Sequence, residues 1–166
     1  MALLEILNGP RTGERLRING QLIQGSHPLH DGDELKICDM ALAFRRDTEL
    51  ARSLAELAIL RTAQVLDCPY ICSRHLSLAR ACGVTDRQIE ELARWPDSAA
   101  FTPAQKAALR FVEQAAQQTR VADGVFLELR RYCSPREIVE LTMLVGFYVS
   151  TAIFIKALAV PDEKAD

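Results

Sequence analysis

The stretch from Glu56 to Gly83 reads ELAILRTAQVLDCPYICSRHLSLARACG and decides the fold. Apolar residues recur with helical spacing before Cys68, which predicts a helix ending near residue 66. Pro69 is unsuited to a helix interior but well suited to the first turn of a new helix. We therefore predict a second helix with Cys68 as its N-cap, which ends where Gly83 supplies a left-handed residue.

Cys68, Cys72 and His75 are spaced i, i+4 and i+7 along this second helix, and so they share one face. A thiol at a helix N-terminus is close to the positive end of the macrodipole, so its pKa is expected to fall. His75 lies one turn beyond Cys72 and is placed to act as its base. Glu56, on the preceding helix, can fold back onto the same face. The four residues predict a proton-relay and thiol site.

A purely structural role is the alternative interpretation of the same residues. Buried free cysteines are common in helical cores. A histidine on a mixed helix face is more often structural than catalytic. The spacing alone leaves both interpretations open.

The segment 54–84, with Glu56, Cys68, Tyr70 and His75, resembles the carboxymuconolactone decarboxylase family, which includes the alkylhydroperoxidase D-like proteins. The similarity extends over about residues 48–160 and includes the turn Trp95-Pro96-Asp97. It implies a mainly α fold, an antiparallel bundle of about six helices over residues 47–166. Family members are typically homotrimers or hexamers, so the resemblance also implies a homo-oligomer.

The peroxidase branch of this family has a glutamate, then Cys-x-x-Cys, then a histidine four residues after the second cysteine. Glu56, Cys68 and His75 match those positions, but Ile71 stands where the second cysteine is expected and Cys72 comes one residue late. Cα atoms four residues apart on a helix are separated by about 6 Å, which is near the upper limit for a disulfide. A Cys68–Cys72 redox pair would therefore be strained.

Three functions follow from the resemblance. The preferred hypothesis is a thiol-dependent peroxidase with peroxiredoxin-type antioxidant activity, in which Cys68 or Cys72 attacks a peroxide and His75 and Glu56 move protons. The second is acid–base chemistry in the manner of the decarboxylase branch, on a small carboxylated or lactone-like substrate. Arg61 or Arg74 could hold an acid group of that substrate, but a solvated salt bridge is the preferred interpretation of either arginine. The third is an oligomeric or binding protein that has lost its activity.

The last helix departs from many relatives, which have Asn after the tyrosine and Arg four residues later. Here the corresponding residues are Val149 and Ile153. Tyr148 remains, and we take it, together with Tyr70, as a candidate substrate-binding residue. A buried tyrosine with one satisfied hydroxyl is an equally good interpretation of Tyr148.

Composition narrows the class of protein. The chain has 166 residues, 49% of them hydrophobic, and a formal net charge of −2, which argues against a basic nucleic-acid-binding surface. The longest apolar stretch, 141–160, is interrupted by polar residues, so we expect a buried helix and no membrane span. Five cysteines without a disulfide framework, and no signal-peptide pattern, predict a cytoplasmic protein. No metal site or cofactor is predicted.

Residues 1–46 differ in kind from the rest and hold five of the eight glycines. Strand-like alternation and the turn signal Asn19-Gly20 predict a small all-β meander of four or five short strands, with a loop through Gly25 and Pro28. The segments 9–13, 18–20 and 28–37 resemble pieces of a forkhead-associated domain. The phosphothreonine-binding elements of that domain are absent, so phosphopeptide binding is not implied. We expect an appendage that covers a helix or mediates oligomer contacts.

Capping signals predict the remaining helices. Asp47 or Thr48 is expected to cap the first helix, and capping boxes begin at Thr85, Thr102 and Ser134. A further helix is expected from Asp123 through Arg131. The last helix, which Pro161 terminates, is nearly apolar all round, so we expect burial on several sides, part of it against another subunit.

Overall fold

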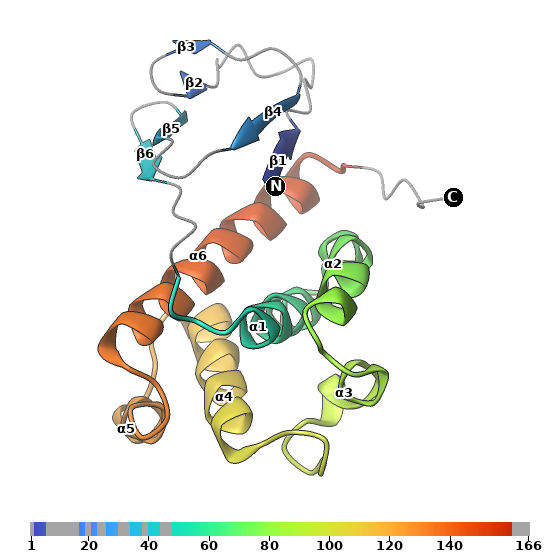
Figure 1. Ribbon diagram of the computed structural model, residues 1–166, viewed down its shortest axis with the longest axis vertical. Helices are drawn as coiled ribbons and strands as arrows, with labels where there is room; N and C mark the ends of the chain where they lie inside the picture. Colours follow the sequence, from blue (N-terminus) through green and yellow to red (C-terminus); the bar gives the residue numbers. More distant parts are fainter. Residues whose placement is uncertain are drawn as a thin grey trace. The chain divides into compact units, whose positions relative to one another are not determined.

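The computed structural model describes residues 48–160 in full, and before them the backbone of six short strands (Figure 1). The chain divides into two compact units, Met1–Thr48 and Glu49–Asp166. The predictions that fall on the other residues of the first unit lie outside the described part of the chain.

The first unit contains two small antiparallel sheets. The strands are β1 (Ala2–Glu5), β2 (Arg17–Ile18), β3 (Gln21–Leu22), β4 (Ser26–Leu29), β5 (Glu34–Ile37) and β6 (Met40–Ala43). β1 pairs with β4, and the second sheet has the order β3-β2-β5-β6. The strands β2 and β3 flank Asn19-Gly20, as the turn signal predicts. The predicted loop through Pro28 is wrong, because Pro28 pairs with Leu3 in the first sheet.

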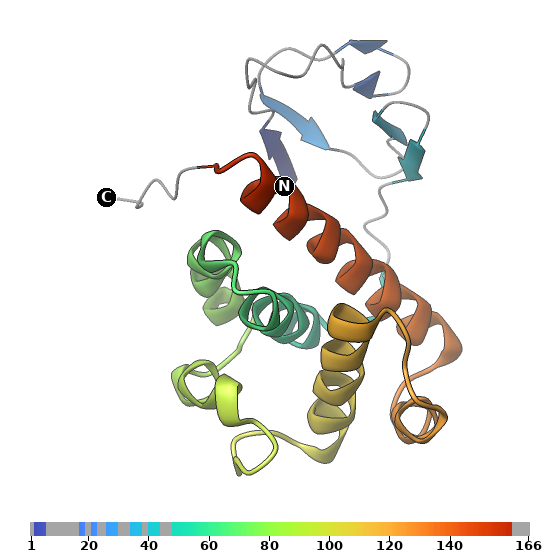
Figure 2. The same cartoon turned by 180° about the vertical axis from the view of Figure 1, so that it is seen from behind.

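The second unit is an all-α bundle, which confirms the predicted fold class. Its elements are α1 (Arg52–Val65), α2 (Pro69–Ala81), α3 (Asp86–Glu91), a 3-10 turn η1 (Leu92–Arg94), α4 (Pro103–Gln118), α5 (Asp123–Leu129) and α6 (Pro135–Ala157). α1 contacts α2, α4 and α6, so it is the central helix (Figures 1 and 2).

Capping chemistry explains most of the helix starts. Thr85, Thr102 and Ser134 each form a capping box with a Gln or Glu three residues later, as predicted. Cys68 is the N-cap of α2, and Gly83 follows its end with a φ of 90°. The predicted start of α1 is wrong: Ala51 is its N-cap, without a side-chain cap. Instead, Glu140 of α6 accepts hydrogen bonds from the backbone N–H groups of Glu49 and Leu50.

The bundle core forms three apolar clusters around α1. One lies between α1, α4 and α6 and includes Ala58, Val112 and Leu141; a second surrounds Trp95 and Leu57. The third, between α1, α2 and α6, includes Ile59, Ile71 and Ala152 together with both cysteines of the predicted site. Side chains of α1, α2 and α6 pack together in this third cluster.

The last helix is buried on one side only within this chain, and the predicted burial of the rest against another subunit stays a prediction. Leu141, Val145 and Ala152 of α6 are buried, but a second set of apolar side chains is exposed: Val139, Met143, Phe147, Ile153, Phe154 and Leu158. By length and composition α6 is also apolar enough to cross a membrane, and 22% of that apolar stretch is buried. The expectation that no stretch reaches the length of a membrane span is therefore wrong by that measure. The polar residues that interrupt this stretch do not lower its mean hydropathy enough, because the residues around them are strongly apolar.

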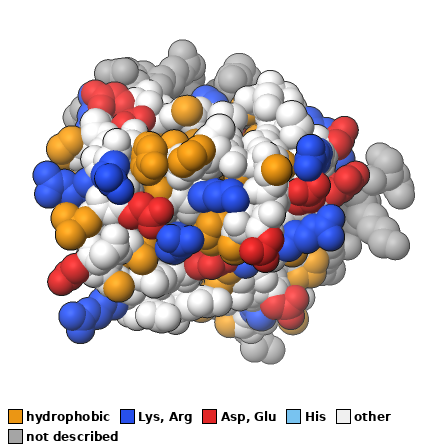
Figure 3. Space-filling model, turned by 90° about the horizontal axis from the view of Figure 1, so that it is seen from below, with side chains coloured by type: hydrophobic (Ala, Val, Ile, Leu, Met, Phe, Trp, Pro, Cys, Tyr) orange, Lys and Arg blue, Asp and Glu red, His pale blue; other side chains and the backbone are white. Residues whose placement is uncertain are grey.

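The surface of the bundle carries mixed charge on the face drawn in Figure 3. Lysine and arginine side chains lie among aspartate and glutamate side chains there, with apolar atoms between them. No single-sign field covers this face. This distribution agrees with a net charge of −2 in a chain that is one quarter charged.

Candidate active site

Three helices each contribute one polar side chain to a common centre. Glu56 comes from the first half of α1, His75 from the middle of α2 and Tyr148 from the second half of α6. Each helix turns its apolar side to the same cluster, and this brings the three polar groups together at the edge of that cluster. Glu56 is only 4% exposed, and it is one of four buried polar or charged residues in the described part of the chain.

His75 is hydrogen-bonded at both ring nitrogens. Its Nδ1 lies 2.8 Å from Oε2 of Glu56, and its Nε2 lies 3.0 Å from the hydroxyl oxygen of Tyr148. A carboxylate can only accept, so Nδ1–H donates to Glu56, and neutral His75 then has its free lone pair on Nε2. The Tyr148 hydroxyl donates to that lone pair. The partners therefore fix both the tautomer and the ring orientation of His75.

Burial raises the pKa of the Tyr148 hydroxyl. Desolvation raises the pKa of Tyr148 to about 12; the negative charge of Glu56 also raises it, and the positive charge of Arg52 lowers it. The phenol therefore keeps its proton near neutral pH and is a hydrogen-bond donor. Its ring also packs edge-on against the imidazole, with 5.1 Å between the ring centroids.

The cysteines lie beside this centre, packed among apolar side chains. Cys68 is buried, Cys72 is partly buried, and both belong to the third cluster with Tyr148. Within residues 48–160, the hydrogen bonds of His75 go to Glu56 and Tyr148 and not to a thiol. Burial, and next to it the charge of Cys68, raise the pKa of the Cys72 thiol. Cys72 therefore lacks the lowered pKa that marks an activated thiol.

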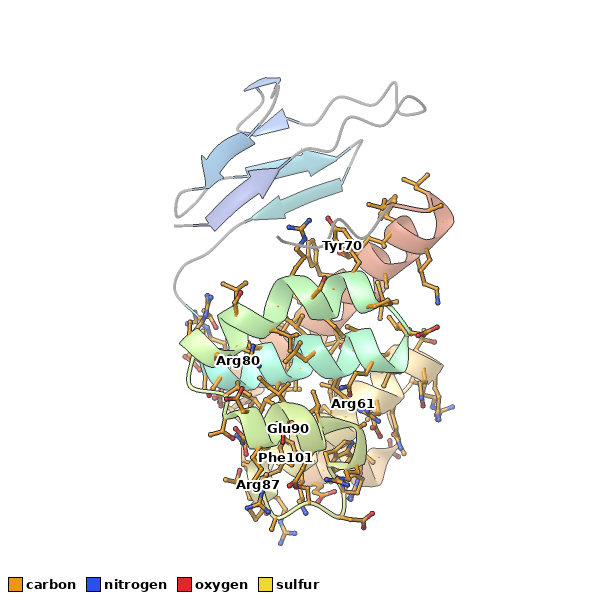
Figure 4. The ribbon with its side chains drawn as sticks, turned by 90° about the vertical axis from the view of Figure 1, so that its right-hand side faces the viewer. Arg61, Tyr70, Arg80, Arg87, Glu90 and Phe101 are labelled. Atoms are coloured by element: carbon orange, nitrogen blue, oxygen red, sulfur yellow. The ribbon has the colours of Figure 1, made fainter. Side chains whose placement is uncertain are left out.

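Tyr70 packs against the third cluster, as Tyr148 does, and the two arginines suggested by the sequence contact other partners. Arg74 stacks over the Tyr70 ring, 5.3 Å from its centroid. Arg61 forms an ion pair with Glu113 in which Nε and Nη2 both donate to Oε1, with 2.7 Å from Nε to Oε1. Arg61 and Tyr70 lie on opposite sides of the α1–α2 pair in Figure 4. Arg61 is therefore paired with Glu113 of α4, which confirms the salt bridge that the sequence interpretation preferred for it over holding a substrate.

Among residues 48–160, Arg52 is the charged residue acting on this centre that the sequence interpretation missed. It is the first residue of α1, is exposed, and its charge acts on the Tyr148 hydroxyl. The signal in the sequence was its position four residues before Glu56, which places both side chains on one side of the helix. Recognising it also required knowing that α6 packs against that side.

Residues 36–114 match the family model of the carboxymuconolactone decarboxylase family. The matched segment begins within the first unit and ends in α4, so it contains Glu56 and His75 but not Tyr148. The uncharacterized protein YdfG of Bacillus subtilis is 26% identical over 105 residues, which is 62% of this chain and 71% of that protein.

Solved structures share the helical fold. ATU0492 of Agrobacterium tumefaciens, described as a protein of unknown function and putative antioxidant defence protein AhpD, matches with a TM-score of 0.65 and 23% identity over 68% of this chain and 79% of that one. The C82A variant of the debrominase Bmp8, in complex with 2,3,4-tribromopyrrole, matches with a TM-score of 0.61 and 18% identity over 67% of this chain and 60% of that one. At these identities the likeness concerns the fold alone.

Proposed function

Starting from its membership of the carboxymuconolactone decarboxylase family, we propose that this chain is an acid–base enzyme acting on a small carboxylated molecule. The observation that carries the proposal is the position of His75, hydrogen-bonded at Nδ1 to buried Glu56 and at Nε2 to Tyr148. A histidine that a carboxylate orients through one ring nitrogen, and that accepts a hydrogen bond from a hydroxyl at the other, is suited to proton transfer.

Glu56 and His75 have distinct roles in the proposed chemistry. When His75 takes up a proton at Nε2, the carboxylate of Glu56 stabilises the imidazolium through Nδ1–H. The protonated ring then donates through Nε2–H to the Tyr148 oxygen. Tyr148 passes its own hydroxyl proton to the substrate as it receives the one from His75, so that no free phenolate forms. This concerted transfer fits a phenol with a pKa of about 12.

For a decarboxylation, the bond between the substrate's carboxylate and the adjacent carbon breaks, and its electron pair moves into a conjugated carbonyl as CO2 leaves. The enolate so formed takes the proton of Tyr148 on carbon, and His75 restores that proton. One proton is consumed for each CO2 released, and solvent returns it to His75. Run in the other direction, the same relay removes a proton next to a carbonyl.

The test is a screen of small unsaturated lactones and keto acids that carry a carboxylate, followed in D2O by NMR. CO2 release or deuterium uptake on carbon by the parent is the expected result. We expect His75→Ala and Glu56→Gln each to lower the rate by about 10²–10⁴-fold, the usual size of a general acid–base contribution. The matched control is Cys82→Ser, which removes a thiol at the far end of α2 and should leave the rate unchanged. No reaction with any member of the panel would contradict the proposal.

Thiol-dependent peroxide reduction is the second candidate, because Cys68 and Cys72 pack in the same cluster as Tyr148. A thiolate would attack the peroxide and release an alcohol, leaving a sulfenic acid. The other thiol would condense with it to a disulfide and water, and an added dithiol would reduce that disulfide. The putative antioxidant role of ATU0492 also favours this candidate.

Peroxide turnover with a dithiol reductant tests this candidate. Loss of turnover in Cys68→Ser or Cys72→Ser, with turnover kept in Cys82→Ser, would support it. Peroxide turnover that is absent in the parent, or that survives both substitutions, would rule it out.

A further inference from the structure

We propose that Arg52 binds a carboxylate of the substrate and thereby selects anionic molecules for the Glu56–His75–Tyr148 centre. The reaction that follows binding rests on the proposed function. The binding site itself is argued from the position and charge of Arg52. It assigns the anion-binding role to a residue of α1 in place of Arg61, which is committed to Glu113.

The position of Arg52 on α1 is the first argument. Arg52 begins the helix and Glu56 follows one turn later, so both side chains project from the same side. Glu56 is buried and holds His75, whereas Arg52 is exposed. A ligand approaching from solvent on this side of α1 therefore meets a cation one helical turn before it meets the proton-transfer groups.

The charges that act on Tyr148 are the second argument. The hydroxyl of Tyr148 feels the negative charge of Glu56 and the positive charge of Arg52. An anionic substrate at this hydroxyl would be repelled by Glu56 and attracted by Arg52. Arg52 therefore supplies the compensating positive charge that a carboxylate next to buried Glu56 requires.

The availability of Arg52 is the third argument. Five other arginines of the bundle form ion pairs with carboxylates: Arg61, Arg80, Arg87, Arg110 and Arg136. Arg52 has no hydrogen bond or ion pair with any residue between 48 and 160. Its planar fork of donors is therefore free to bind a carboxylate with two parallel hydrogen bonds.

The experiment measures anion binding directly and does not need a known substrate. The protein, with 15N-labelled histidine, is titrated at constant ionic strength with acetate, succinate, glutarate and benzoate, and the side-chain resonances of His75 are followed. Succinamide, which has the length of succinate without its charge, is the uncharged control. We expect a saturable shift of the His75 resonances with at least one of the four carboxylates and none with succinamide.

The variants are Arg52→Met, Arg52→Lys and, as an exposed arginine elsewhere, Arg120→Met. Loss of a charge-assisted hydrogen-bond pair predicts at least about tenfold weaker binding in Arg52→Met. Arg52→Lys should recover part of the affinity, and Arg120→Met should match the parent. Equal affinity in Arg52→Met and the parent, or no saturable shift with any of the four carboxylates, would overturn the proposal.

Failure of this proposal can be told apart from failure of the proposed function. If the acid–base function is wrong but Arg52 binds anions, the titration still shows saturable binding that Arg52→Met weakens, and turnover is absent. If the function is right but Arg52 does not bind substrate, Arg52→Met keeps the parent's KM while His75→Ala still loses kcat. A rise in KM for Arg52→Met with little change in kcat is the expected pattern.

Discussion

The hydroxyl oxygen of Tyr148 lies 3.0 Å from Nε2 of His75, although the two residues are 73 positions apart in the chain. Together with the 2.8 Å contact between Nδ1 and Glu56, this relationship leaves neither imidazole nitrogen for a resting thiol. It is the reason for placing acid–base chemistry ahead of the thiol peroxidase that the sequence favoured.

The pH dependence of stability should report on Tyr148. Its folded pKa of about 12 is above the unfolded value of about 10, so the folded state binds this proton more tightly. The stabilisation is fully present below about pH 10 and is lost as the pH rises towards 12, by up to roughly 2–3 kcal/mol. Urea denaturation between pH 8 and 12 should show this loss in the parent and a smaller one in Tyr148→Phe. Equal losses in both proteins would contradict the assignment.

Thiol reactivity should distinguish Cys72 from an activated nucleophile. Burial and the charge of Cys68 raise the pKa of Cys72, so its thiolate fraction near neutral pH is below that of a free cysteine. We predict slower alkylation of Cys72 than of glutathione at pH 7, with a rate that still increases above pH 9, measured by peptide mass spectrometry. Alkylation of Cys72 faster than that of glutathione at pH 7 would favour the peroxidase.

The Glu113 network should be a stability determinant remote from the chemistry. Glu113 accepts hydrogen bonds from Arg61 and, at 2.7 Å, from the indole N–H of buried Trp95. Glu113→Ala leaves a largely buried arginine without its partner, so we predict a loss of about 3 kcal/mol. The fluorescence of Trp95, the single tryptophan, reports unfolding in urea.

Glu90, an exposed residue labelled on α3 in Figure 4, supplies the matched control for that measurement. Glu90→Ala should change stability by less than about 0.5 kcal/mol. A Glu113→Ala protein as stable as Glu90→Ala would show that the network contributes nothing.

The exposed side of α6 should mediate self-association. Phe147, Phe154 and Met143 are each more than half exposed, and contiguous apolar surface of this kind usually marks an interface. The family resemblance makes a second copy of this chain the expected partner. Light scattering should show an oligomer in the parent and a smaller species for Phe154→Asp, while Phe126→Asp on α5 should behave as the parent. A monomeric parent would contradict this prediction.

Much of the helical unit could be predicted from the sequence because its signals are local. The three capping boxes, the Pro69 start and the Gly83 stop involve residues within four positions of one another. The shared face of Cys68, Cys72 and His75 is a consequence of helical spacing on α2. The position of Glu56 beside that face could be predicted because α1 and α2 form a helical hairpin.

The rest depends on packing between distant segments. The contact of Tyr148 with His75 requires α6 to cross α1 and α2 at a particular register, which periodicity does not fix. The pairing of Arg61 with Glu113 depends in the same way on α4, so a free arginine and a paired one look alike in sequence. Apolar composition on every side of α6 predicts that the helix needs partners, but it does not show which side this chain covers and which side is left for another subunit.

The side-chain 15N spectrum of His75, assigned with His75→Ala and recorded for the parent, Glu56→Gln and Tyr148→Phe, tests the proton relay most directly. From the partners of the two ring nitrogens we expect a proton on Nδ1 and none on Nε2 in the parent. Tyr148→Phe should move the Nε2 resonance, and Glu56→Gln should move the Nδ1 resonance. A parent ring protonated at Nε2 alone, or resonances that neither substitution moves, would contradict the proposed proton relay.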